Sequence, residues 1–407
     1  MSTLAEARAL DAADPIAGYR KQFALPPGVI YLDGNSLGAL PLGTAARLGE
    51  VIRREWGEGL VRSWNSADWI GLPRKVGAMI APLIGAGPDE VIACDSTSVN
   101  LFKLIAAALD MRPGRKVVLS EPGNFPTDLH LIAGLEGQGL AEKRLAARED
   151  LEAALNGSVA VLLLTHVHYK TGAMHDMARL THAAHEAGAL VLWDLSHSVG
   201  AVPVDLNACE ADFAVGSGYK YLNGGPGAPA FAYVARRHLP ALQQPLTGWF
   251  GHAEPFAFRD DYAPAPGIER LLTGTPPILG LVALEEGVRL IAEIGVERLA
   301  AKSRALSQFL RAAIAEVAPD LACVSPEDPA PHGSHLSFGH PEAYAVAQAL
   351  IARGVIPDFR EPDVLRLGLA PAYLRFEDCW HAAQVLGEVL TSGEWERAEF
   401  RTRAAVT

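Results

Sequence analysis

Residues 193–200 read Trp-Asp-Leu-Ser-His-Ser-Val-Gly, residues 216–225 read Gly-Ser-Gly-Tyr-Lys-Tyr-Leu-Asn-Gly-Gly, and these two stretches decide the fold of the chain. Asp194 ends one apolar run, and Lys220 follows a second apolar run directly before a glycine-rich turn. A pyridoxal phosphate enzyme needs this arrangement, because a carboxylate keeps the pyridine nitrogen protonated and a lysine amine forms a Schiff base with the cofactor. The two stretches therefore predict a pyridoxal phosphate site centred on Asp194 and Lys220.

Each of these two residues has a plainer interpretation when it is taken alone. Asp194 could be a helix N-cap or one half of a salt bridge, and Lys220 could be a surface lysine whose stem packs on the fold. Together they favour the cofactor, because a carboxylate and an amine beside apolar strands are costly to bury unless each has a partner.

The surrounding segments predict a mainly parallel α/β sheet. Short apolar runs without alternation indicate strands that are buried on both faces, and they alternate with helical segments such as 178–187. Ligands of such sheets bind beyond the carboxyl ends of the strands, where Ser120, Thr165, Asp194 and Gly216 fall. The predicted strands are 91–94, 116–119, 159–164, 189–193, 213–215 and 229–234.

The order of predicted helices and strands changes after about residue 320 and predicts a smaller C-terminal α+β domain. Apolar periodicity indicates helices over about 277–294 and 295–318 before this change. We expect an N-terminal segment (1–60), a large cofactor-binding domain (61–290) and a small domain (291–407). Near the N-terminus a strand at 29–32 and a helix over about 44–56 are predicted. In the small domain the predicted strands are 335–338, 355–356 and 364–367, the helices are 341–353 and 376–390, and 325–333 is a proline-rich loop.

Composition narrows the class of protein. The chain has 407 residues, 49% of them hydrophobic, which is enough for a large core, and its net charge of -12 argues against a nucleic-acid partner. Four cysteines without a CxxC pair fit a reduced, intracellular protein. No signal peptide or membrane-spanning run is apparent, so we expect a cytoplasmic protein without a membrane partner.

Three further positions are candidates for the site. Ser96, Thr97 and Ser98 precede a predicted helix and could hold a phosphate, or simply cap that helix. Phe125 could stack on a planar cofactor or plug the core. Arg366 lies on a short apolar strand, where its guanidinium could bind a carboxylate with two hydrogen bonds or form a cross-strand ion pair.

Histidines between residues 166 and 185 raise the question of a metal. His166 and His168 share one face of a strand end, and His182 and His185 share a helix face, with His175 between them. No cysteine or carboxylate completes a set at a familiar spacing, so no metal site is predicted.

Over most of its length the chain resembles the kynureninase family of fold type I, class V aminotransferase-like pyridoxal phosphate enzymes. The resemblance implies a seven-stranded sheet with a smaller C-terminal α+β domain, and a homodimer with active sites at the interface. The ordered Asp-Leu-Ser-His-Ser-Val-Gly and Tyr-Lys-Tyr-Leu-Asn blocks are its specific part. The other matching segments are 32–38, 97–101, 124–128, 167–169, 171–172 and 275–278.

The family implies a role for each matching residue. Lys220 carries the cofactor, Asp194 pairs with its pyridine nitrogen with His197 beside it, and Phe125 stacks on the ring. Asparagine is usual in relatives where this chain has Thr275, whose hydroxyl can still donate to a phosphate. Thr97, Ser98, Asp128, Thr165 and Tyr219 surround the phosphate and ring, Trp249 and Thr275 reach a phosphate across the dimer, Arg366 binds the substrate α-carboxylate, and Asn35, Ser36 and Trp64 build the substrate pocket.

The implied reaction is hydrolysis of L-kynurenine to anthranilate and L-alanine in tryptophan catabolism, with Lys220 as base and Tyr219 as a candidate proton donor. The sequence does not separate L-kynurenine from 3-hydroxy-L-kynurenine. Two rival interpretations are a cysteine desulfurase, which needs a mobile cysteine near the substrate, and a catalytically silent scaffold on the same fold. The absence of a cysteine around Arg366 argues against the first, and Asp194, Lys220 and Arg366 together argue against the second.

Overall fold

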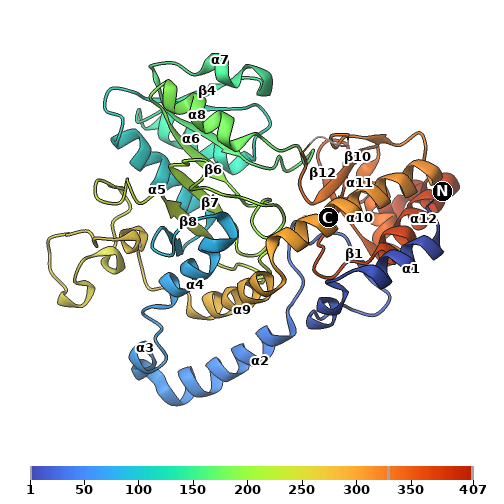
Figure 1. Cartoon of the computed structure of the whole chain (residues 1–407), viewed down its shortest axis with the longest axis horizontal. Helices are drawn as coiled ribbons and strands as arrows, with labels where there is room; N and C mark the ends of the chain where they lie inside the picture. The colour runs from blue at the N-terminus through green and yellow to red at the C-terminus, as the bar shows by residue number, and fades with distance from the viewer. Residues whose placement is uncertain (1, 328–330, 405–407) are drawn as a thin grey trace.

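The computed structural model describes residues 2–327 and 331–404, and its larger part is built on a seven-stranded sheet (Figure 1). The strands are β2 (Val91–Ala93), β3 (Val117–Ser120), β4 (Glu142–Leu145), β5 (Val159–Thr165), β6 (Leu190–Asp194), β7 (Phe213–Gly216) and β8 (Phe231–Val234). Their order is β2-β8-β7-β6-β5-β3-β4. Only β8 runs antiparallel to its neighbours. The predicted mainly parallel sheet is confirmed.

Helices cover both faces of this sheet, which explains why its central strands are apolar throughout. Successive residues of a strand point to opposite faces, so Leu162 and Leu164 of β5 pack in one core cluster and Val161 and Leu163 pack in the other. The first cluster lies under α4 (Leu72–Ile80), α8 (Met177–Glu186) and α9 (Ile278–Ile294), and the second under α5 (Thr97–Asp110) and α6 (Pro126–Gly137).

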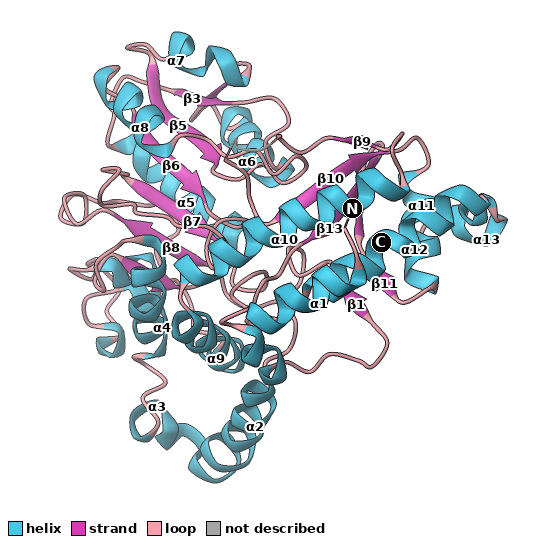
Figure 2. Cartoon of the chain, turned by 45° about the vertical axis from the view of Figure 1, so that its right-hand side comes forward, coloured by secondary structure: helices cyan, strands magenta, loops and turns pink. Residues whose placement is uncertain are grey.

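The smaller part has an antiparallel sheet with the order β12-β13-β10-β9. Its strands are β9 (Ala322–Cys323), β10 (His335–Gly339), β12 (Asp358–Arg360) and β13 (Val364–Gly368), and its helices are α10 (Val296–Val317), α11 (Ala343–Ala352), α12 (Phe376–Ser392) and α13 (Ala398–Arg401). Figure 2 shows this sheet beside the large one, with α10 running along it.

The N-terminal residues join the smaller part. Helix α1 (Leu4–Ala13) packs along α12, and β1 (Ile30–Tyr31) pairs in parallel with β11 (Val355–Ile356). In Figure 1, α1 accordingly lies beside α12. The turn that follows β1 is thereby carried to the boundary between the two sheets. The division at residues 60 and 290 remains a prediction.

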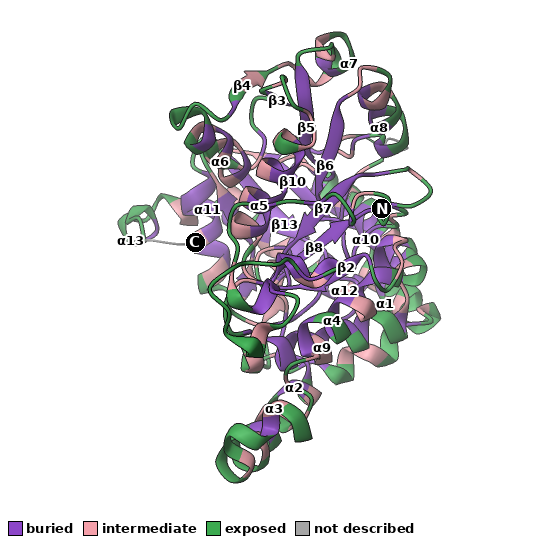
Figure 3. Ribbon diagram, turned by 90° about the vertical axis from the view of Figure 1, so that its left-hand side faces the viewer, coloured by how far each residue is buried: buried purple, intermediate pink, exposed green. Residues whose placement is uncertain are grey.

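An arm projects from the body of the molecule (Figure 3). It consists of α2 (Leu42–Glu50), a π-helix η2 (Val51–Gly59) that continues it, and α3 (Ser63–Ser66). The sequence predicts one helix over about 44–56, and the structure extends it at both ends. The other short helices are α7 (Leu151–Ala154) and the 3₁₀ turns η1 (Ala17–Gln22), η3 (Leu60–Arg62), η4 (Ala81–Ile84), η5 (Arg148–Asp150), η6 (Trp249–Gly251), η7 (Pro255–Ala257), η8 (Ile268–Leu271) and η9 (Glu394–Glu396).

Three strands were not predicted from the sequence. β4 and β9 are partly or fully exposed, and β12 reads Asp-Phe-Arg, so none shows the apolar run of a buried strand. The predicted loop over 325–333 includes residues 328–330, which lie outside the described part of the chain. Among the described residues, no helix is both long enough and apolar enough to cross a membrane.

Candidate active site

Lys220 lies in a turn shortly after β7, and only 7% of its surface is exposed. Its Nζ is 3.0 Å from Nε2 of His197, which follows the neighbouring strand β6. Because β6 and β7 are parallel, their carboxyl ends meet at the same edge of the sheet. The interpretation of Lys220 as a surface lysine is therefore wrong.

Two buried carboxylates face this lysine. Asp194 ends β6 and accepts a hydrogen bond from the Ser196 backbone N–H at 2.7 Å, and Asp128 lies in the first turn of α6. Thr165, which ends β5, has its hydroxyl 3.2 Å from Asp128 Oδ2. Asp128 Oδ1 and His197 Nδ1 are buried without a hydrogen-bond partner among the described residues.

Burial shifts the pKa of each of these charged groups. Burial raises the pKa of Asp194, and burial followed by the charge of Asp194 raises the pKa of Asp128 well above its usual range. Burial lowers the pKa of Lys220 to about 8, although Asp194 opposes the shift. A desolvated amine of this kind is a suitable nucleophile for a carbonyl group near neutral pH.

Phe125 directly precedes α6 and borders the same space. The centroid of its ring lies 5.5 Å from Lys220 Nζ, and Tyr169 packs against it edge-on at 5.2 Å. The ring is half-buried rather than enclosed in the core. A planar group attached to Lys220 could therefore stack on Phe125.

Hydroxyl groups gather at the start of α5. Ser96 is the N-cap and accepts from the Val99 N–H at 3.3 Å, as the capping interpretation expects. Thr97 Oγ1 lies 3.2 Å from Ser217 Oγ, and Ser98 follows it in the first turn. The Tyr219 ring centroid is 5.9 Å from Lys220 Nζ. A helix N-terminus with hydroxyls is suited to a phosphate.

Arg366 on β13 is 1% exposed and is bound to a carboxylate that the sequence analysis did not single out. Its Nε donates to Asp358 Oδ1 at 2.9 Å, and its Nη2 donates to Asp358 Oδ2. Asp358 lies directly opposite Arg366 in the register of β12 and β13. The cross-strand ion pair, one of the two interpretations from the sequence, is thus present.

The turn after β1 completes this second group. Ser36 Oγ donates to Asp358 Oδ2 at 2.6 Å and accepts from Arg366 Nη2 at 3.0 Å. With its amide oxygen turned toward the guanidinium, Asn35 accepts from Arg366 Nε at 2.9 Å. The Gly38 N–H donates to the Tyr219 carbonyl at 2.8 Å, so the turn also packs against the lysine segment.

Three predicted residues lie elsewhere. Trp64 packs on Phe250, and Trp249 joins Phe250 in an aromatic cluster, with Trp249 and Thr275 exposed. Among the described residues, no recorded hydrogen bond, ion pair or ring contact joins any of the three to Lys220, Asp194 or Arg366. Within a single chain, Trp64, Trp249 and Thr275 do not contact these three residues, and their roles in the site stay predictions.

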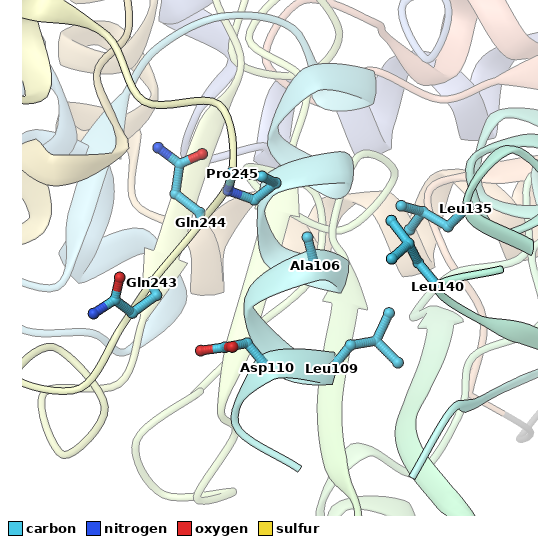
Figure 4. A pocket seen from close by; sticks show the side chains of 8 residues that line it. All are labelled: Ala106, Leu109, Asp110, Leu135, Leu140, Gln243, Gln244 and Pro245. Atoms are coloured by element: carbon cyan, nitrogen blue, oxygen red, sulfur yellow. The ribbon is translucent and has the colours of Figure 1, made fainter. Parts of the chain in front are cut away.

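Two cavities of similar size differ in chemistry. A cavity of about 480 Å³ lies between the start of α6 and β12, and its lining includes Phe125, Tyr169 and Arg360. A second, of about 400 Å³, lies on the outer side of α5 and is lined mainly by leucine and glutamine side chains (Figure 4). Only the first shares its walls with the residues around Lys220 and Arg366.

The histidines have structural partners. His175 Nε2 lies 2.8 Å from Glu121 Oε1, and His166 Nδ1 lies 2.9 Å from Ser198 Oγ. His185 contacts Asp212 at 2.8 Å. Within the described residues, no group of three or more His, Cys, Asp or Glu side chains is arranged to hold a metal.

The donor set fits pyridoxal phosphate. Asp194 is a buried acid that forms no ion pair within the described part of the chain, although the charge of Lys220 acts on it, Asp128 and His197 have unpartnered buried atoms, and Lys220 is a desolvated amine. These groups are costly to bury unless a polar ligand completes their hydrogen bonds.

Comparisons with known proteins identify relatives of this chain over its whole length. A family model described as the kynureninase C-terminal domain matches residues 299–386. The kynureninase of Burkholderia mallei is 51% identical over the whole of both chains, and that of Pseudomonas fluorescens is 49% identical over the whole of both chains. This chain belongs to the kynureninase family.

Solved structures show the same fold for this member of the kynureninase family. The cysteine desulfurase from Thermococcus onnurineus superimposes with a TM-score of 0.79 at 20% identity, covering 92% of this chain and 98% of its own. The cysteine desulfurase CsdA from Escherichia coli gives a TM-score of 0.77 at 19% identity, covering 93% and 98%.

Sequence reasoning missed part of the site in this kynureninase family member. Asp358 and Arg360 lie on β12, Asp33 precedes the turn at Asn35, and Asn124 contacts Thr165. The signal that could have found Asp358 is its charge, because an acid followed two residues later by an arginine is unusual next to the apolar run of β13.

Proposed function

We propose that this chain hydrolyses L-kynurenine to anthranilate and L-alanine with pyridoxal phosphate as cofactor, as a step of tryptophan catabolism. The observation that carries the proposal is the contact between Lys220 and His197 beside buried Asp194, in a chain that is 51% identical to a kynureninase over its full length. Pyridoxal phosphate, when bound, supplies an electron sink for charge that develops on the substrate α-carbon.

The roles in cofactor binding and proton transfer are assigned to individual residues of the chain. We assign Lys220 to hold the cofactor and then to accept the α-proton at Nζ, since its lowered pKa makes the neutral amine available near pH 8. With the cofactor bound, Asp194 would keep the pyridine nitrogen protonated, His197 would pack beside it, and Phe125 would stack on the ring. Thr97, Ser98, Asp128, Thr165 and Tyr219 are assigned to the phosphate and the ring substituents.

The substrate is held from the opposite side of the site. We assign the α-carboxylate to the Arg366 pocket with Asn35 and Ser36, which places the α-carbon between Arg366 and Lys220. Hydrolysis adds water across the Cβ–Cγ bond, so the γ-carbonyl becomes the anthranilate carboxylate and the β-carbon takes up a proton. Tyr219, 5.9 Å by its ring centroid from Lys220 Nζ, is our candidate for delivering that proton.

The test uses the purified protein loaded with pyridoxal phosphate and L-kynurenine as substrate. Wild type is expected to absorb in the visible range and release anthranilate. A Lys220→Ala variant is expected to lose both the lysine-linked absorbance and turnover. Persistence of both in Lys220→Ala would overturn the assignment of Lys220, and absence of anthranilate release from wild type would overturn the proposed function.

A cysteine desulfurase is disfavoured by where the cysteines lie. Cys94 and Cys379 are buried in the core, and Cys323 contacts Arg311 on α10. No described cysteine contacts the groups around Lys220 or Arg366. We expect no sulfide release when the protein is assayed with cysteine beside the kynurenine assay.

We further propose a cytoplasmic homodimer, with a second copy covering an aromatic patch. Trp249, Phe256 and Phe258 are 40%, 52% and 75% exposed and contact one another. Phe250 links this patch to Trp64 of α3, in the projecting arm. Burial of such apolar surface favours association. In the dimer, Trp249 and Thr275 would serve the site of the second copy, and sedimentation analysis tests this.

A further inference from the structure

Arg366 alone has little hydrogen-bonding capacity left for a substrate. Its Nε and Nη2 are bound to Asp358, its Nη1 donates to the Tyr169 carbonyl at 2.6 Å, and Ser36 also accepts from Nη2. A guanidinium has five N–H donors, and two parallel bonds to a carboxylate need two of them on one edge. A substrate carboxylate arriving at Arg366 therefore needs a second donor nearby.

Arg360 supplies that donor. Its Nη2 donates to the same Asp358 Oδ2 at 2.7 Å and to Ser36 Oγ at 3.1 Å, so both guanidiniums meet at one carboxylate oxygen. Its Nη1 makes only a long contact of 3.4 Å to the Phe359 carbonyl, and its Nε has no acceptor among the described residues. Arg360 thus keeps donors that Arg366 has already used.

The position of Arg360 also faces the route into the site. Its side chain is 34% exposed, against 1% for Arg366, and it lines the cavity of about 480 Å³ between the start of α6 and β12. Phe125 and Tyr169 line the same cavity, and Phe125 borders Lys220. A carboxylate entering by this cavity meets Arg360 before it meets Arg366.

The charges around the cavity favour this assignment. Arg403 is paired with Glu361 at 2.7 Å, and Lys170 donates to the Glu361 carbonyl at 2.5 Å. Arg360 and Arg366, in contrast, share the single carboxylate of Asp358. While the nearby Asp33 is protonated, two guanidiniums paired with one carboxylate leave an excess positive charge where a substrate anion would bind.

We propose that Arg360 is a second substrate-binding arginine, which takes one oxygen of the amino-acid α-carboxylate while Arg366 takes the other. Asp358 acts as a positioning residue that holds the two guanidiniums side by side. The inference rests on the proposed function, because it assigns a contact to the substrate of that reaction. It extends the carboxylate pocket from one arginine to two.

The test compares L-kynurenine with its methyl ester, which lacks the carboxylate charge, using the loaded enzyme. Loss of a charge-assisted hydrogen bond in Arg360→Gln is expected to raise the KM for L-kynurenine about tenfold with kcat nearly unchanged. The inhibition constant of the ester, measured by competition, is expected to stay the same. Arg360→Lys keeps the positive charge but lacks the paired N–H donors of a guanidinium, and it is expected to recover part of the loss. It also keeps the test informative if Arg360→Gln does not fold.

Arg403→Gln is the matched control, because it removes a guanidinium from the same cavity that is already paired with Glu361. It is expected to leave the KM for L-kynurenine unchanged. The proposal is overturned if Arg360→Gln weakens acid and ester equally, if it weakens neither, or if Arg403→Gln weakens the acid as much. Failure of wild type to cleave L-kynurenine would instead overturn the proposed function itself.

Discussion

The two ends of the site bury charged groups in opposite ways. Around Lys220 the acids Asp194 and Asp128 have raised pKa values, and buried atoms of Asp128 and His197 lack partners. Around Arg366 the buried acid Asp358 is fully paired, and its neighbour Asp33 is the exception, with a raised pKa and one buried oxygen without a partner among the described residues. Burial alone would raise the pKa of Asp358, but Arg366 and Arg360 hold it below its usual range.

This difference indicates which part of the site is complete without a ligand. Unpaired buried charge costs stability, and it is retained where a ligand completes it. The Lys220 end (the unpaired end: Lys220, Asp194, Asp128 and His197) is therefore suited to a cofactor. The Arg366 end (the paired end: Arg366, Arg360, Asp358 and Ser36, with Asp33 beside them) is assembled by the protein itself and needs only a substrate anion. Removing the acid at the Lys220 end is accordingly expected to lower activity without lowering stability, whereas removing the acid at the Arg366 end is expected to lower stability.

The largest expected effect is on activity at the unpaired end. Asp194→Asn removes the charge that we assign to the pyridine nitrogen, and we expect kcat for L-kynurenine to fall roughly 10²–10³-fold. The cofactor-free variant should be at least as stable as wild type at pH 7. The reason is that a carboxyl whose pKa is raised on folding destabilises the native state above its unfolded pKa. Anthranilate release and urea unfolding measure the two quantities.

The second effect is on stability at the paired end. Asp358→Asn leaves the buried guanidinium of Arg366 without its counter-charge, and breaking a buried ion pair in this way costs about 3–5 kcal/mol of unfolding free energy. Because the pKa of Asp358 is depressed on folding, its contribution is present above the unfolded value and is lost as the pH falls through the folded value. Urea unfolding at pH 7 and at low pH checks both parts. If Asp194→Asn proved as destabilising, the contrast between the two ends would disappear.

The third effect is a pH dependence that arises within the paired end. Burial and then the charge of Asp358 raise the pKa of Asp33 to about 7, with Ser36 and Arg366 opposing the shift. Above pH 7 the ionised Asp33 partly cancels the arginine charge, so the KM for L-kynurenine should rise by roughly fivefold between pH 6.5 and 8.5.

Asp33→Asn is the variant that isolates this titration. It is expected to remove the rise in KM while the pH profile of kcat keeps its shape. The nearby Tyr31 and Tyr373 have pKa values raised by burial and remain neutral over this range. A rise in KM that persisted in Asp33→Asn would assign the titration to another group.

The smallest effect concerns one hydroxyl at the unpaired end. Thr165→Val removes the hydroxyl that donates to Asn124 Oδ1 and lies 3.2 Å from Asp128 Oδ2, and its loss changes stability by about 1 kcal/mol. Thermal unfolding of the cofactor-free protein measures it. A loss as large as that expected for Asp358→Asn would show that this end is also held together by its own polar groups.

The local sequence predicts the parts of the molecule that depend on neighbouring residues along the chain. The unbroken apolar run of β5 indicates a strand buried on both faces, and β6 and β7 end at Asp194 and just before Lys220. Parallel pairing then brings those ends together, so the core of the site follows from the order of the segments. The roles of these residues remain assignments until they are tested.

The paired end is different, because its partners come from distant parts of the chain. Ser36, Tyr169, Asp358 and Arg366 meet only after β1 has paired with β11 and β12 with β13. The three residues of β12 are too few and too polar to indicate a strand, so Asp358 and Arg360 were not predicted.

By itself, the sequence of this protein determined the sheet, the lysine and the acid, because period, apolar runs and strand order are local properties. Only the tertiary structure decided which charges are paired and which are left for a ligand. The free energy of a buried charge depends on its neighbours in space, and strand register places Asp358, rather than solvent, against Arg366.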